Sequence, residues 1–133
     1  MQEVPPYDGI EAMVKALNKS GGKLFVLTSN YKENVELFLH HYKLKPFFTD
    51  IQTVAYATTW TKTRALRSMM RQYDLKDGDT YHVGNEALDM RAAQRVGIRG
   101  VAVTWGGFNL EALKKTKPFA IIDKPSELTD LLQ

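Results

Sequence analysis

One segment constrains the fold more than any other, the residues YHVGNEALDMRAAQRVGIRGVAVTWGG from Tyr81 to Gly107. Its pattern predicts a short apolar strand that ends in a Gly-Asn turn and a helix that begins near Ala87. A turn closed by glycine and a second apolar strand, which ends at Trp105, complete the unit. A strand–loop–helix–strand unit places its loop at the carboxyl end of a parallel sheet, where open α/β proteins bind ligands.

The predicted loop of this unit carries three polar residues, Asn85, Glu86 and Asp89. Polar and acidic residues are also ordinary at the start of a helix, where they cap free N–H groups and offset the helix dipole. The spacing alone therefore leaves two interpretations equally open, a solvated loop that caps a helix and a loop that binds a ligand.

Length and composition indicate an ordinary globular protein. The chain of 133 residues predicts a single domain over residues 1–133, in which residues 1–7, with two prolines, form an extended tail. The hydrophobic share of 44% and the charged share of 25% are typical of globular domains. The absence of cysteine excludes disulfides and thiolate metal sites.

Charge and hydropathy argue against several classes of partner. The net charge is +3, but lysine and arginine are scattered along the chain, so nucleic-acid binding is not expected. The chain begins without a signal-peptide pattern and contains no apolar run of the roughly 18 residues that a membrane span needs. We therefore predict a cytoplasmic protein that has no membrane partner.

The rest of the chain alternates between helical and strand patterns. Asp8 is expected to cap a first helix that stops at Ser20-Gly21-Gly22, and Thr59 or Thr61 to cap a later one that runs to Tyr73. Such alternation predicts an α/β fold with a mostly parallel sheet and right-handed crossovers. The other predicted strands cover residues 23–27, 50–54, 80–83 and 119–122, and the other helices cover 32–42, 109–115 and 126–132.

Three pieces of the chain occur in a familiar order. They are LTSN after the first strand, Lys62 before the third helix, and VGNEALDMRAAQRVGI followed by VAVTWG. Together they resemble the haloacid-dehalogenase superfamily, and within it the phosphoglycolate-phosphatase-like hydrolases. The family pattern is a strand ending in Thr or Ser, a later Lys, and then VGD-x-x-x-D, AA-x-x-AG and V-x-V-x-WG. The resemblance runs from Pro6 to about Leu132.

This resemblance implies a fold, a reaction and a set of site residues. The implied fold is a Rossmann-like three-layer sandwich, and the implied reaction is Mg²⁺-dependent hydrolysis of small phosphorylated metabolites through an aspartyl-phosphate. Thr28 and Lys62 are the implied catalytic residues, and both bind phosphate. The implied sites are Thr28, Ser29, Asn30 and Lys62 for phosphate, and Asn85, Glu86 and Asp89 for Mg²⁺.

Two features depart from the family pattern. The D-x-D-G-T motif that carries the nucleophilic Asp is absent, together with the cap domain, and Asn85 stands where the family has a metal-binding Asp. Asn can ligate Mg²⁺ through its carbonyl oxygen but brings no charge, so we expect a weakened site. We therefore predict a hydrolase by family that is catalytically incomplete in this chain. The alternative is a non-catalytic domain that binds a phosphorylated ligand or a protein. No G-x-G-x-x-G or G-x-x-x-x-G-K-[ST] loop supports an unrelated nucleotide-binding domain.

The missing motif also removes the strand that lies at the centre of the family's sheet. An unfilled gap would leave unpaired N–H and C=O groups at two inner strand edges. Three arrangements are open. The strand at 23–27 pairs directly with that at 80–83, a second chain fills the gap in a homodimer, or an N-terminal segment upstream of Met1 supplies the strand.

Overall fold

The computed structural model describes residues 8–106 and 109–132, and the chain divides into two compact units. The first unit contains residues 1–55 and 124–133, and the second contains residues 56–123. The expected extended tail, residues 1–7, lies outside the described residues. The single domain over residues 1–133 stays a prediction.

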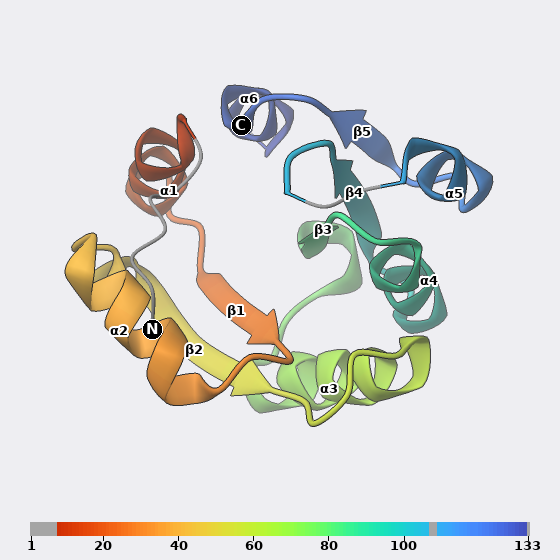
Figure 1. The fold of residues 1–133 in the computed structure, drawn as a ribbon, viewed down its shortest axis with the longest axis horizontal. Helices are drawn as coiled ribbons and strands as arrows, with labels where there is room; N and C mark the ends of the chain where they lie inside the picture. The colour runs from red at the N-terminus through yellow and green to blue at the C-terminus, as the bar shows by residue number, and fades with distance from the viewer. Residues whose placement is uncertain (1–7, 107–108, 133) are drawn as a thin grey trace. The chain divides into compact units, whose positions relative to one another are not determined.

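The first unit combines a two-stranded parallel sheet with helices (Figure 1). Thr28 stands opposite Thr53, so strands β1 and β2 end side by side. Helix α1 packs against β1 and against α6, through which the end of the chain returns to this unit. One cluster of this unit's buried core contains Val14, Leu39, Leu44 and Ile51. The elements are α1 (Ile10–Lys19), β1 (Leu24–Thr28), α2 (Lys32–His41), the 3₁₀ turn η1 (Lys45–Phe47), β2 (Phe48–Thr53) and α6 (Pro125–Leu132).

The start of α1 differs from the prediction. The N-cap is Gly9, with a left-handed φ of 89°, and no side chain caps the helix. Because an N-cap side chain bonds the amide two or three residues later, Asp8 comes one position too early, and its predicted capping role is wrong. The predicted end is confirmed, since the helix is followed by Ser20 and by Gly21 at a φ of 93°.

The second unit contains a three-stranded parallel sheet in the order β3-β4-β5 (Figure 1). The central strand, β4, is buried from Gly100 to Val103. Helix α4 packs on β3 and β4, and α3 packs along α4. One cluster of this unit's buried core contains Met90, Ala102 and Leu113. The elements are α3 (Thr59–Gln72), η2 (Asp77–Asp79), β3 (Tyr81–Gly84), α4 (Ala87–Val96), β4 (Arg99–Val103), α5 (Leu110–Lys115) and β5 (Ala120–Ile122).

Helix α3 begins with a capping box. Thr58 is the N-cap, and its hydroxyl accepts a hydrogen bond from Thr61 N at 3.0 Å, while the Thr61 hydroxyl accepts one from Thr58 N at 3.0 Å. The predicted caps, Thr59 and Thr61, are therefore wrong as N-caps, although Thr61 closes the box from the third helical position.

The predicted α/β class is confirmed by the ladders, because each one among the described strands is parallel. Strand β1 pairs with β2, and β3 pairs with β4. Among the described residues, the ladders therefore do not include the direct pairing of the 23–27 strand with the 80–83 strand. Within residues 8–106 and 109–132, every helix is too short or too polar to cross a membrane.

Candidate functional site

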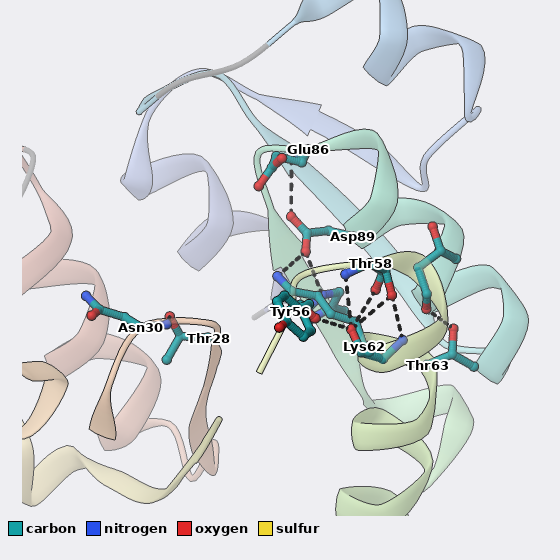
Figure 2. Close-up of polar contacts among 11 residues, drawn as sticks. Thr28, Asn30, Tyr56, Thr58, Lys62, Thr63, Glu86 and Asp89 are labelled. Carbon is teal, nitrogen blue, oxygen red and sulfur yellow. Dashed lines mark hydrogen bonds and ion pairs between the residues drawn. The ribbon is translucent and has the colours of Figure 1, made fainter. Parts of the chain in front are cut away.

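The best-defined polar cluster of the second unit is built around Asp89, which lies in the first turn of α4 and is only 3% exposed. Its Oδ1 accepts a hydrogen bond from Lys62 Nζ at 2.5 Å, and its Oδ2 accepts one from Glu86 N at 3.3 Å (Figure 2). A buried carboxylate is costly unless it is paired and hydrogen-bonded. The cluster meets this condition at both oxygens.

The helices explain how Lys62 reaches Asp89. The two residues are 27 positions apart in sequence, but α3 packs along α4, and both residues lie near the N-terminal ends of their helices. The Lys62 side chain is buried along its length, with only 8% of the residue exposed. The sequence singled out Lys62 and Asp89 separately, and the structure brings them into direct contact.

Gly84 makes room for the buried carboxylate. A Cβ atom on this residue, the last of β3, would lie 2.5 Å from both the Cβ and the Cγ of Asp89. Real Cβ atoms do not approach other atoms that closely, so any side chain at position 84 would displace Asp89. The glycine of the VGN sequence is therefore required by close approach, a role that the sequence interpretation did not assign.

His82 is a further member of the cluster that the sequence interpretation missed. Only 9% of the residue is exposed, and its Nε2 lies 3.6 Å from Asp89 Oδ1. That separation is too long for a direct hydrogen bond, and Nε2 has no hydrogen-bond partner among the described residues. The available signal was a titratable residue within the apolar strand pattern YHVG.

The surroundings keep Asp89 ionised. Burial alone would raise the pKa of its carboxyl group, but the adjacent His82 and Lys62 side chains favour the carboxylate, and the net effect lowers the pKa below its usual range. The site therefore holds an ionised, buried carboxylate beside the Lys62 side chain near neutral pH.

Asn85 is directed to the segment that follows β4. Its Nδ2 lies 3.4 Å from the carbonyl oxygen of Trp105 and donates a hydrogen bond to it. This contact links the loop after β3 to the segment after β4, and it leaves the Asn85 carbonyl oxygen as its only candidate metal ligand. Glu86 is exposed at the same loop.

The residues expected to bind Mg²⁺ do not fit a complete magnesium site. Among the described residues, no group of three or more His, Cys, Asp or Glu side chains is arranged to hold a metal ion. Both oxygens of Asp89 are engaged by Lys62 and by the backbone, and Asn85 offers no charge. The metal-binding roles of Asn85, Glu86 and Asp89 stay predictions.

The other expected phosphate-binding residues belong to the first unit. Thr28 ends β1, and its Oγ1 accepts a hydrogen bond from Asn30 N at 3.1 Å. Asn30 Oδ1 accepts bonds from Tyr31 N at 2.8 Å and from Asn34 Nδ2 at 3.3 Å. These bonds shape the turn from β1, through Ser29, into α2, and the phosphate-binding roles of this turn stay predictions.

Comparisons with known proteins agree with the order of the motifs. A profile of the family described as "Haloacid dehalogenase-like hydrolase" matches residues 1–103. The phosphoglycolate phosphatase of Synechococcus elongatus is 30% identical over 122 residues, which are 92% of this chain and 57% of that protein. The pyrophosphatase PpaX of Bacillus mycoides is 28% identical over 130 residues, which are 97% of this chain and 60% of that protein.

Solved structures show the same fold. A haloacid dehalogenase-like family hydrolase from Streptococcus pneumoniae superposes with a TM-score of 0.82 at 22% identity, over 96% of this chain and 60% of that one. This likeness confirms the Rossmann-like fold expected from the motifs. The chain spans about 60% of the length of the curated relatives that it matches. With a family profile that covers most of the chain, the protein belongs to the haloacid dehalogenase-like hydrolases.

Proposed function

We propose that this chain is a haloacid dehalogenase-like phosphatase domain that binds the phosphoryl group of small phosphorylated metabolites. The observation that carries the proposal is the buried contact between Lys62 and Asp89. An ammonium group has three N–H donors, and Asp89 takes one of them, so Lys62 can still donate to phosphoryl oxygens. Its charge would offset the negative charge that develops during phosphoryl transfer.

The carboxylate of Asp89 has a supporting part in this proposal. It fixes Lys62 Nζ through the 2.5 Å contact, and it accepts a hydrogen bond from Glu86 N in the loop after β3. A positioned cation is worth more at a dry site than in water, because the low local dielectric strengthens its interaction with an anion.

The two curated relatives limit what is proposed about the substrate. One is named a phosphoglycolate phosphatase and the other a pyrophosphatase. Their shared chemistry is hydrolysis at phosphorus in a small molecule, so we propose that class, with phosphoglycolate-like phosphomonoesters as the first substrates to test. The cytoplasmic location stays a prediction.

We further propose that this chain does not complete the reaction alone. Its sequence contains no D-x-D-G-T motif to supply the nucleophilic Asp, and Asn85 replaces a charged metal ligand. Mg²⁺, when bound in this family, neutralises charge on the phosphoryl group. The residues described here lack the carboxylates for that ion, so a segment upstream or a second copy of the chain would have to supply them together with the missing strand.

The second candidate is a non-catalytic domain that recognises a phosphorylated ligand or a protein. The observation that favours it is the hydrogen bond from Asn85 Nδ2 to the carbonyl oxygen of Trp105. This bond gives residue 85 a structural partner that a metal-binding carboxylate could not have, because a carboxylate cannot donate a hydrogen bond. Phosphate binding without hydrolysis is the behaviour that this candidate predicts.

Thermal unfolding with inorganic phosphate, with and without Mg²⁺, tests the proposal. Phosphate at about a hundred times its Kd should add roughly 2.7 kcal/mol to the stability of a domain that binds it. The double variant Lys62→Met/Asp89→Asn removes both charges of the buried pair and should lose this stabilisation. The control Lys115→Ala removes an exposed lysine of the same unit and should retain it. No stabilisation of the wild type, or equal stabilisation of the double variant, would overturn the proposal.

A further inference from the structure

His82 is a buried polar group that the proposed function does not use. It lies on β3, with 9% of the residue exposed, and its Nε2 has no hydrogen-bond partner among the described residues. A buried polar nitrogen that lacks a partner has given up its hydrogen bonds to water without replacing them, and this carries a cost in free energy. Such a cost in the middle of the site calls for a physical explanation.

The geometry around Asp89 Oδ1 supplies one. Two donors face this oxygen, Lys62 Nζ at 2.5 Å and His82 Nε2 at 3.6 Å. The other carboxylate oxygen accepts a bond from Glu86 N, and the backbone of Gly84 lies close against the Asp89 side chain. Asp89 is therefore held from several sides. His82 Nε2 lies just beyond hydrogen-bond distance of Asp89 Oδ1, the oxygen that accepts the hydrogen bond from Lys62.

We propose that His82 is a positioning residue that hydrogen-bonds Asp89 Oδ1 when Lys62 shifts its ammonium group toward a bound phosphoryl oxygen and so lengthens, without giving up, its own contact with Asp89. This inference rests on the proposed function, because it requires an anion that competes with Asp89 for Lys62. The new bond needs only that Nε2 carries its hydrogen, and it keeps the buried carboxylate hydrogen-bonded throughout. The distance to be closed, from 3.6 Å to about 2.9 Å, is within the reach of side-chain adjustment.

The first test is the dissociation constant of inorganic phosphate, measured by titration calorimetry on the 133-residue chain. His82→Leu removes the Nε2–H donor that would bond Asp89 Oδ1 in the phosphate-bound state. Phosphate binding should weaken on the order of tenfold, the effect expected for losing a hydrogen bond to a charged group. His82→Gln retains an N–H donor on a side chain of similar reach and should restore the affinity to within roughly twofold. In an Asp89→Asn background the difference between Leu and Gln at position 82 should shrink, since the charged acceptor is gone.

The second test uses the folded wild type and so does not depend on any variant. The chain contains three histidines, and His40 and His41 are exposed on α2. Addition of phosphate should shift the ¹⁵N resonance of His82 Nε2 and leave those of His40 and His41 in place.

The outcomes separate the two proposals. Wild-type protein that does not bind phosphate overturns both of them. Phosphate binding that depends on Lys62, but is equal in His82→Leu and wild type or leaves the His82 resonance unmoved, overturns the role of His82 alone. A loss in His82→Leu that His82→Gln does not restore would mean that the imidazole acts through packing and not as a donor.

Discussion

At the scale of single residues, Asp89 connects the parts of the candidate site. Its carboxylate accepts hydrogen bonds from Lys62 on α3 and from Glu86 N in the loop after β3. Its side chain also lies close against Gly84, which has no Cβ atom to displace it. A buried ion pair is weak evidence of stabilisation, since desolvation can exceed the attraction between the charges. In the proposed function, the role of the pair is to hold Lys62 Nζ in place for a bound phosphoryl group.

Removal of one partner of this pair should be costly. Lys62→Met leaves the Asp89 carboxylate buried without its cation, and we expect the free energy of unfolding to fall by about 3–5 kcal/mol. The double variant Lys62→Met/Asp89→Asn should recover most of that loss, because it leaves no uncompensated charge. Urea unfolding of the wild type, Lys62→Met, Asp89→Asn and the double variant measures the difference. Two single losses that simply add in the double variant would show that the residues are not coupled.

Stability should also depend on pH through Asp89. The folded protein holds the pKa of this group below its unfolded value, so its contribution is present above about pH 4 and is lost as the pH falls through the folded pKa. The unfolding free energy of the wild type should therefore fall more between about pH 6 and pH 3 than that of Asp89→Asn. Parallel curves for the two proteins would contradict the assigned pKa shift.

Gly84 offers a steric test of the same site. Gly84→Ala places a methyl group within 2.5 Å of Asp89 atoms, and we expect a loss of about 1–3 kcal/mol together with weaker phosphate binding. Gly78→Ala is the matched control, because a Cβ there meets no atom within 4 Å, and its effect should stay within about 0.5 kcal/mol. Equal effects of the two substitutions would refute the close approach.

At the scale of elements, the sequence patterns located the helices and strands well. The helix predicted to begin near Ala87 does begin there. The prediction was possible because the spacing of apolar residues changes from a strand pattern to a helical one at the Gly-Asn turn. The misses are at caps. Three threonines stand at the start of α3, and spacing alone does not show which of them has the extended backbone of the N-cap, while at α1 the cap is a glycine without any side chain to signal it. Thus Thr58 was passed over for Thr59 and Thr61, and Gly9 for Asp8.

The capping box at α3 gives a prediction at this scale. Thr58→Ala removes the acceptor for Thr61 N and should cost about 1 kcal/mol, whereas Thr58→Ser keeps a hydroxyl and should cost little. Chemical denaturation of both variants measures the difference. A loss in Thr58→Ser as large as that in Thr58→Ala would mean that the threonine methyl group, and not the cap, is responsible.

At the scale of the whole molecule, the order of the motifs predicted the family, and their residues supplied half of the site. Lys62 and Asp89 were selected separately from motifs, and only the packing of α3 along α4 shows that they form a pair. His82 and Gly84 were not selected. Their roles come from burial and close approach, which depend on tertiary packing and not on any spacing along the chain.

A complete phosphatase combines phosphoryl binding with hydrolysis, and in our proposal this chain supplies the first of these properties but not the second. Phosphoryl binding is assigned to residues that this chain contains, above all Lys62, while the nucleophile and a charged metal ligand in place of Asn85 are missing from its sequence. The chain spans about 60% of the length of its curated relatives. We propose that the nucleophile and the charged metal ligand of a complete enzyme come from the part of such a protein that this chain does not match.

The most direct test is phosphate release from 2-phosphoglycolate and p-nitrophenyl phosphate by the purified chain, in the presence of Mg²⁺. The same preparation is first shown to be stabilised by inorganic phosphate, and Lys62→Met/Asp89→Asn serves as the control. The account predicts phosphate binding without release above the background of that control. Release that the double variant abolishes would contradict it, because the chain would then contain a nucleophile of its own.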